Sequence, residues 1–252
     1  MRKMSVVLLS GGLDSTTVAA HAKAQGYELV ALTFNYGQRH QREMEAAKRV
    51  ARMLEIRHEV VDLPALKSLS WYSALTDGGI DVPKETTMRD STQDIPITYV
   101  PMRNTVFLTL AAALLESRVL RLIEDGKTGP NEVSASIFIA ANAVDYSGYP
   151  DCRPEYFDAM RRALFEGSKL GKQYGVSIDI ETPVLRMTKA EIVKLAVRLS
   201  APLEHTWSCY EGAEIPCGAC DSCLLRAKGF AEAGIKDPLL KRLRREGKIA
   251  QG

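Results

Sequence analysis

The stretch LLSGGLDSTTV, residues 8–18, combines residue types that could bind an anion. Gly11 and Gly12 can adopt positive φ angles and let backbone N–H groups approach a phosphate closely, and the hydroxyls of Ser10 and Ser15 can donate further hydrogen bonds. The stretch matches neither GxxxxGK[ST] nor GxGxxG, which excludes two common nucleotide-binding motifs. It therefore predicts a phosphate-binding loop of another type.

An acidic residue, Asp14, stands in the middle of this loop. It could serve only as an N-cap that accepts hydrogen bonds from the backbone of the following helix. Alternatively, it could help to hold Mg²⁺ on bound phosphates, because proteins usually bind Mg²⁺ through one or two carboxylates together with phosphate oxygens.

Four of the five cysteines fall in the pattern C-x7-C-x2-C-x2-C, which begins at Cys209. Four thiolates are the donor set of a structural zinc site, in which Cys217, Cys220 and Cys223 come from one tight turn and Cys209 completes the tetrahedron. An iron–sulfur cluster uses four thiolates at similar spacing and is the alternative. A closed four-thiolate site leaves no open position for water, so this metal is expected to stabilise the C-terminal segment and not to perform chemistry.

The anion-binding loop needs a strand before it and a helix after it. Residues 6–9 form a continuous apolar run, which is typical of a strand covered on both faces, and residues 15–25 fit a helix that ends at Gly26. The pattern predicts further strands at residues 29–34, 58–63, 136–141 and 176–180, and helices at residues 38–54, 104–123, 155–174 and 188–199, the last with Thr188 as N-cap. This alternation predicts an α/β fold with an open, doubly wound parallel sheet, which binds ligands beyond the carboxyl ends of its strands.

Two segments lack regular periodicity. Residues 64–98 are expected to form a long loop, and loops of that length in a compact domain are usually functional lids or mobile segments. Residues 124–132 are interpreted as a surface insertion. The basic tail KDPLLKRLRREGK is most simply a solvated charged face, although it could touch RNA.

Length and composition limit the classes of function. The 252 residues are enough for a well-buried core, and the net charge of +2 gives no strong field, which disfavours nucleic acid or a membrane as the main partner. No run approaches the ~18 apolar residues of a membrane span, and no signal-peptide pattern is present. The clustered cysteines do not resemble a secreted disulfide framework. We therefore expect a cytoplasmic protein that acts on a small charged ligand.

The loop SGGLDS, after a strand and before a helix, resembles the SGGxDS loop of the N-type ATP pyrophosphatases, the PP-loop superfamily. Further motifs resemble one family of that superfamily, the 7-cyano-7-deazaguanine synthases of queuosine biosynthesis. They are FNYGQRH, YVPMRNTVFL, DYSGYPDCRPEYF, TKAEI and TWSCY with PCGACDSC. These motifs occur in order over nearly the whole chain.

The resemblance implies a Rossmann-like, adenine nucleotide alpha hydrolase-like fold. It implies an ATP-binding α/β domain over residues 1–200 and a small zinc-binding helical segment over residues 201–252, packed on that domain. The implied activity is a carbon–nitrogen ligase that converts 7-carboxy-7-deazaguanine and ammonia to the nitrile, through adenylated intermediates and an amide. The implied cofactors are ATP, Mg²⁺ and Zn²⁺, and the implied assembly is a homodimer.

The resemblance also assigns roles to residues. The ATP-binding loop is Leu8, Leu9, Ser10, Gly11, Gly12, Leu13, Asp14, Ser15, Thr16, Thr17 and Val18. The predicted catalytic residues are Ser10, Asp14, Ser15 and Lys189, of which Asp14 belongs to the phosphate and Mg²⁺ site. The predicted substrate-binding residues are Arg103, Asn104, Asp145, Tyr146, Asp151 and Arg153. Cys152 could be a nucleophile, but ammonia transfer needs no thiol, so we interpret it as a small, partly buried residue.

Three alternatives use the same loop. A tRNA-modifying relative of the thiolation or lysidine type would need an RNA-binding module or a catalytic thiol pair, and neither is evident. A nucleotide-binding regulator without turnover would not need the motif-rich substrate loop. Synthetases that carry a glutaminase domain are disfavoured because none is visible, which also indicates that free ammonia is used.

Overall fold

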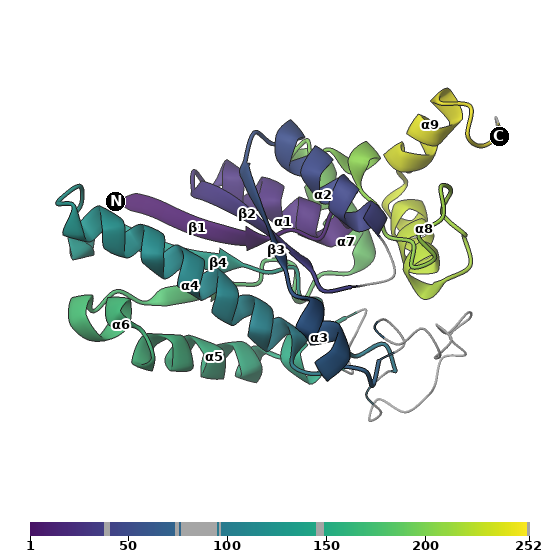
Figure 1. Ribbon diagram of the computed structural model, residues 1–252. Coiled ribbons are helices and arrows are strands. Elements are labelled where there is room, and N and C mark those ends of the chain that lie inside the picture. The colour runs from purple at the N-terminus through teal and green to yellow at the C-terminus, as the bar shows by residue number, and fades with distance from the viewer. Residues whose placement is uncertain (38–40, 74–75, 77–94, 96, 145–148, 251–252) are drawn as a thin grey trace.

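The computed structural model describes residues 1–37, 41–73, 76, 95, 97–144 and 149–250. The predicted substrate residues Asp145 and Tyr146, and most of the predicted loop over residues 64–98, lie outside the described residues. Figure 1 shows the arrangement of the rest, a sheet with helices on both of its faces.

In the described part of the chain, five strands form one sheet in the spatial order β3-β2-β1-β4-β5. Their bounds are β1 (Arg2–Leu8), β2 (Glu28–Asn35), β3 (Arg57–Asp62), β4 (Val133–Phe138) and β5 (Ile178–Glu181). Each neighbouring pair is parallel. Val6 and Val7 of the central strand β1 are fully buried, as expected for an apolar run covered on both faces. The predicted open, doubly wound parallel sheet is confirmed.

Helices cover both faces of the sheet (Figure 1). One face carries α1 (Leu13–Ala24), α2 (Gln41–Met53) and α7 (Lys189–Arg198), and the other carries α4 (Arg103–Glu124), α5 (Pro154–Glu166) and α6 (Lys169–Tyr174). Val18, Val50 and Ile192 are fully buried in the core of the first face, and Leu115 and Phe157 are buried in the core of the second. The helices thus cover both faces of the sheet. The edge at the carboxyl ends of the strands is where a ligand-binding site is expected.

The order of the strands reverses beside β1. The chain runs from β1 outward to β3, and then returns to place β4 and β5 on the other side of β1. In an open α/β sheet the crevice at such a reversal is where ligands bind. The loop predicted to bind phosphate follows β1 directly and therefore lies at this crevice.

Two predicted elements differ in kind from the structure, and the strand predicted over residues 136–141 begins and ends earlier, as β4 (Val133–Phe138). The single helix expected over residues 155–174 is two helices, because Ser168 accepts a hydrogen bond from the backbone N–H of Gly171 at 3.0 Å and caps a new helix, α6. The loop expected over residues 64–98 begins with a short helix, α3 (Pro64–Leu69), in which Pro64 occupies the first turn, where its missing N–H costs nothing.

The C-terminal segment contains α8 (Asp221–Ala233) and α9 (Pro238–Arg245), at the end of the sheet toward which β1 points (Figure 1). Phe230 of α8 packs into the same core as α1 and α7. The basic tail is not simply a solvated face, because α9 is amphipathic and buries Leu239 and Leu243. The domain boundary at residue 200 stays a prediction.

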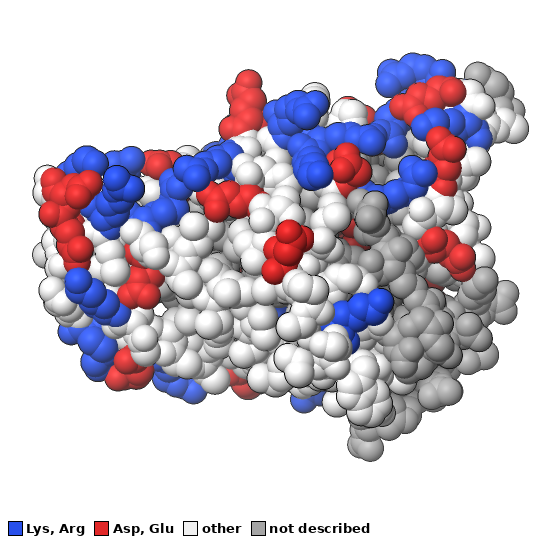
Figure 2. Space-filling model, viewed as in Figure 1, with Lys and Arg blue, Asp and Glu red and all other residues white. Residues whose placement is uncertain are grey.

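Charges of both signs alternate on the surface over α2 and α9. Figure 2 shows Lys and Arg side chains gathered there with Asp and Glu among them. Pairs such as Lys48 with Glu45 at 3.1 Å and Lys248 with Glu214 at 3.1 Å lie in this region. In the described ranges, no helix has both the length and the apolar character needed to span a membrane.

Candidate active site

The loop between β1 and α1 depends on Gly11. Its φ of +87° is a conformation that side chains disfavour, and a Cβ on Gly11 would lie 2.4 Å from the carbonyl oxygen of Glu43 and 2.5 Å from the backbone nitrogen of Ala47. The loop can therefore pass this close to α2 only with glycine at this position. Gly12 follows as the N-cap residue of α1, with no side-chain cap.

The hydroxyls of the loop face one another. Ser10 Oγ and Ser15 Oγ lie 3.0 Å apart, and Ser15 Oγ also accepts a hydrogen bond from the backbone N–H of Ser10 at 3.2 Å. Both serines line the cavities described below. The uncapped N-terminus of α1 and these hydroxyls together form the kind of donor group that binds phosphate.

Asp14 does not cap the helix; it forms an ion pair. Lys189 Nζ, in the first turn of α7, donates to both carboxylate oxygens of Asp14 at 3.0 and 2.7 Å. The side chains are only 11% exposed for Lys189 and 19% exposed for Asp14. The N-cap interpretation of Asp14 is therefore wrong, and the structure brings together two of the predicted catalytic residues.

A glycine of α8 holds Lys189 in this position. A Cβ on Gly229 would lie 2.3 Å from Cγ and 2.9 Å from Cβ of Lys189. The stem of Lys189 thus passes directly over Gly229. The capping box at Thr188, whose Oγ1 accepts from Glu191 N at 3.3 Å, fixes the start of α7 from the other side, as its sequence predicts.

We expect Gly229→Ala to lower turnover strongly while Lys189 itself remains. The added methyl group must displace the Lys189 stem and so disturb the ion pair with Asp14. Steady-state kinetics at varied concentrations of ATP, the cofactor that the resemblance implies, would measure the effect, with Ala227→Val on the exposed side of α8 as the control for added bulk. Parent kinetics in a folded Gly229→Ala variant would contradict the idea that this contact positions Lys189.

A cavity of about 290 Å³ opens at the carboxyl edge of the sheet. Its walls come from the ends of β1 and β2, from the residues after β4 and from the start of α4. The rings of Phe34 and Phe107 stack with centroids 4.1 Å apart and form part of an apolar wall. The cavity suits a flat, largely apolar ring system with a few polar groups.

Arg103 and Asn104, two predicted substrate residues, both line this cavity. Arg103 hydrogen-bonds with Tyr36. Asn104 Nδ2 donates to the backbone carbonyl of Asp151 at 3.3 Å. Asp151 is buried beside this pair, and burial raises the pKa of its carboxyl.

The remaining predicted substrate residues are placed differently. Arg153 is exposed and does not line the cavity, because it becomes the N-cap residue of α5. Cys152 lines the cavity, and burial raises the pKa of its thiol to about 12. A thiol with that pKa is a poor nucleophile at neutral pH, in agreement with its interpretation as a small buried residue.

A second cavity, of about 200 Å³, adjoins the first. It is lined by Gly12, Leu13 and Lys189 and by residues of the C-terminal segment. Ser10, Asp14, Ser15, Glu43, Ala140 and Tyr210 line both cavities. The two spaces therefore meet at the loop after β1.

Of the predicted loop residues, Thr16, Thr17 and Val18 are buried in the packing of α1 and line neither cavity.

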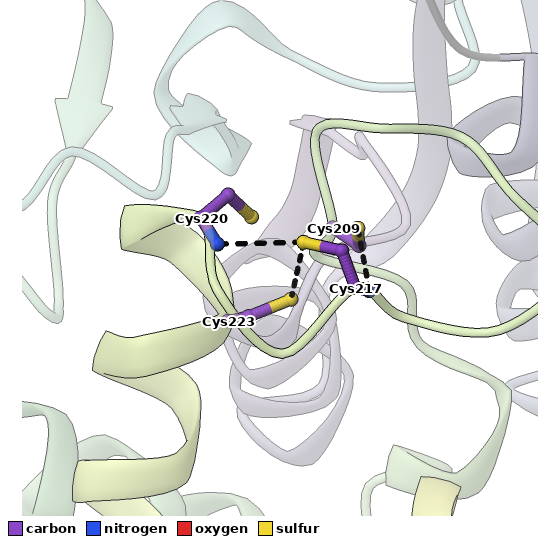
Figure 3. A group of neighbouring side chains, drawn as sticks. All are labelled: Cys209, Cys217, Cys220 and Cys223. Atoms are coloured by element: carbon purple, nitrogen blue, oxygen red, sulfur yellow. Dashed lines mark hydrogen bonds between the residues drawn. The ribbon is translucent and has the colours of Figure 1, made fainter. Parts of the chain in front are cut away.

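The four clustered cysteines converge as predicted. Cys220 and Cys223 come from the start of α8, and Cys209 and Cys217 come from the loop before it (Figure 3). Their ligand atoms all lie within 4.8 Å of one another, and the sulfurs of Cys217 and Cys223 are 4.0 Å apart. Sulfurs at the corners of a tetrahedron around zinc, with Zn–S of about 2.3 Å, would be about 3.8 Å apart. The donor set and its spacing fit a metal ion.

The cysteine cluster is connected to the loop between β1 and α1. Trp207, two residues before Cys209, donates its backbone N–H to the carbonyl of Gly11 at 2.9 Å, and its indole N–H bonds to the carbonyl of Cys209 at 3.1 Å. On α8, Arg226 forms a buried ion pair with Asp237 at 2.6 Å. The C-terminal segment therefore acts as one wall of the site.

Comparison with known proteins identifies the family. A family model described as "Queuosine biosynthesis protein QueC" matches residues 4–234. The chain belongs to the QueC family. A 7-cyano-7-deazaguanine synthase from Thermoplasma acidophilum is 50% identical over 94% of this chain and 92% of that protein. One from Trichodesmium erythraeum is 46% identical over 94% of this chain and 99% of that protein.

The resemblance stated from the motifs is thus confirmed, and with it the prediction that the chain is an enzyme of this family. Among solved structures, the NMN synthetase from Francisella tularensis aligns over 100% of this chain at 17% identity and a TM-score of 0.41. That similarity is too low to support an inference about function.

Sequence reasoning missed Glu43 and Tyr210, which line both cavities. Glu43 lies in the first turn of α2, which follows the carboxyl end of β2, and this position at the binding edge was the available signal. Tyr210 follows Cys209 directly. Tyr210 reaches the loop after β1 only when the segment around Cys209 folds against that loop. No local sequence pattern shows this tertiary contact.

Proposed function

We propose that this QueC family member is an ATP-dependent ligase that converts 7-carboxy-7-deazaguanine and ammonia to 7-cyano-7-deazaguanine. The observation that carries the proposal is the junction of two cavities at the SGGLDS loop, with a phosphate-binding loop on one side and an apolar, aromatic cavity on the other. An enzyme that adenylates a heteroaromatic acid needs these two spaces to meet where the acid and the α phosphate react.

The loop and Lys189 bind the triphosphate in this proposal. The N-terminus of α1 and the hydroxyls of Ser10 and Ser15 donate hydrogen bonds to phosphate oxygens. Asp14 would hold Mg²⁺, and Mg²⁺ would neutralise charge on the phosphates. Lys189, held beside the loop by its ion pair with Asp14, would stabilise the negative charge that develops on the phosphates. The protein's contribution is to position the reactants and to stabilise phosphate charge.

The larger cavity binds the deazaguanine in this proposal. The Phe34 and Phe107 rings supply an apolar wall, and Arg103 supplies a positive charge for the carboxylate. Asn104 supplies a side-chain amide beside Arg103.

The reaction itself needs two activations. A carboxylate oxygen leaves poorly, and transfer of AMP onto it makes a good leaving group that ammonia displaces. The resulting amide needs a second adenylation before its oxygen can leave and the nitrile can form.

We also propose zinc as the ion of the four-cysteine site, with a structural role. Four thiolates close the coordination shell and leave no position for a reacting water. The remaining elements of the proposal are free ammonia as the nitrogen donor, a cytoplasmic location, no nucleic-acid partner and a homodimer.

The test is incubation of the zinc-loaded protein with 7-carboxy-7-deazaguanine, ATP, Mg²⁺ and ammonium, followed by mass analysis of the products. We expect the nitrile, and we expect none without ammonium or without ATP. The alternative is modification of a tRNA base by a PP-loop enzyme of the thiolation or lysidine type. A parallel incubation with unmodified tRNA and ATP would detect it, and a modified nucleoside without nitrile formation would overturn the proposal.

A further inference from the structure

The reaction proposed above has a requirement that phosphate binding does not meet. Ammonia enters with three protons on nitrogen, and the nitrile nitrogen has none. In the first round, the lone pair of nitrogen forms the C–N bond, AMP leaves with the C–O electron pair, and one proton must leave the nitrogen. In the second round, AMP again leaves with the C–O electron pair, and both remaining N–H protons leave as the triple bond forms. A base must therefore lie beside that nitrogen in both rounds.

We infer that Glu43 is the base that accepts these protons. This inference rests on the proposed function. Glu43 lines both cavities, so it lies where the acid-binding space meets the phosphate-binding loop, and that is where an adenylated carboxyl group has to lie. Its position is fixed by the backbone, because the carbonyl of Glu43 packs against Gly11 so closely that a Cβ there would be 2.4 Å away.

The other ionisable groups around the junction are less suited to this task. Among the described residues that line the two cavities, the only carboxylates are Asp14 and Glu43, and none is a histidine. Asp14 accepts two hydrogen bonds from Lys189, so its charge is already balanced. Burial raises the pKa of the Cys152 thiol to about 12, which leaves it protonated at neutral pH.

The groups that face Glu43 come from several elements. Arg103 of α4 and Tyr36 at the end of β2 lie on the side of the larger cavity, where burial also raises the pKa of Tyr36 and of Tyr149. Lys189 of α7 and Arg226 of α8 line the smaller cavity. Tyr210 lines both.

The environment also tunes the proton affinity of Glu43. Burial raises the pKa of its carboxyl to about 7, and the positive charge of Arg103 partly opposes that rise. A carboxylate with a pKa near neutrality is a stronger base than an ordinary one and is still largely ionised above pH 7. Because two protons leave the nitrogen in the second round, Glu43 must release each proton to water, through the cavities that it lines, before it accepts the next.

The decisive comparison is between adenylation and amination in Glu43→Gln. Adenylation of the acid needs no base, because the carboxylate is already the nucleophile. We expect pyrophosphate–ATP exchange with 7-carboxy-7-deazaguanine, measured without ammonium, to remain near the parent level. We expect amide formation at a fixed concentration of free ammonia, and conversion of added amide to nitrile, each to fall by about 100-fold, the scale of general base catalysis.

The pH profile provides a second readout. At fixed free ammonia, the parent rate of amide formation should rise with pH through about 7 as Glu43 loses its proton. This rise should disappear in Glu43→Gln. Glu45→Gln, two positions along α2 and exposed, is the matched control and should keep the parent rate and profile.

Parent rates and an unchanged profile in Glu43→Gln would overturn the inference, and so would loss of pyrophosphate exchange in a folded variant. If Glu43→Gln does not fold, the rate and pH profile of Glu43→Asp test whether Glu43 is the base. The shorter carboxylate of this variant should slow amide formation and shift the pH at which the rate rises. The parent rate and pH profile in Glu43→Asp would assign the pH dependence to another group. Failure of the proposed function is separate, because the parent protein itself would then form no nitrile.

Discussion

We expect Asp14→Asn to slow the conversion of acid to nitrile by at least about 100-fold, the scale on which removal of one charge-stabilising group acts. The carboxylate of Asp14 lies in the loop that would bind the triphosphate, and it holds Lys189 through two hydrogen bonds. The substitution would remove the proposed ligand for Mg²⁺ and also the anchor that holds Lys189 beside the loop. Both losses act on the same step, the transfer of AMP.

The measurement is the initial rate of nitrile formation at saturating ATP, together with pyrophosphate–ATP exchange. Asp179→Asn on β5 is a matched control, since this aspartate is exposed and lies away from the loop. Thermal unfolding of both variants shows whether the fold is kept. Turnover near the parent rate in a folded Asp14→Asn variant would show that the ion pair with Lys189 is only structural.

Cys220→Ser should lose the metal ion and with it the activity. Purified parent protein is expected to hold about one zinc ion per chain, because four thiolates make one closed site. Without it, the start of α8 loses its link to the loop that carries Cys209 and Cys217. The backbone bond from Trp207 to Gly11 should then weaken, since Trp207 packs in the same cluster as the cysteines. We expect a lower melting temperature and little turnover.

Elemental analysis of the purified proteins and thermal unfolding test this expectation. Cys152→Ser is the control, because Cys152 lies in the larger cavity and outside the cluster, so it should retain the metal. Iron in the parent protein would contradict zinc. A Cys220→Ser variant that unfolds at the parent temperature without metal would contradict the structural role.

The sequence predicts best those features that are local. The apolar run of β1, the SGGLDS loop and the start of α1 are contiguous, and so is the tight turn that brings Cys217, Cys220 and Cys223 together. Each is specified by a few neighbouring residues, and the structure contains all of them.

Features that depend on tertiary contacts were not predicted. Lys189 lies 175 positions from Asp14, and nothing local shows that they pair or that Gly229 makes room for the lysine stem. Arg103 and Asn104 do reach the larger cavity, because α4 begins at the carboxyl edge of the sheet. Arg153 does not reach it, because Arg153 is the N-cap residue of α5 and is exposed. The polar motif in the sequence does not show where that helix begins.

In the proposed mechanism, the loop after β1 directs cleavage of ATP at the α phosphate, twice for each nitrile. Nucleotide chromatography during turnover, combined with mass analysis of the deazapurines, tests it most directly. We expect two AMP and two pyrophosphate for each nitrile formed, and an amide that accumulates transiently when ATP is limiting. We also expect added amide to be converted to nitrile with ATP and without ammonia. Stoichiometric ADP in place of AMP, or an added amide that is never converted, would contradict this mechanism.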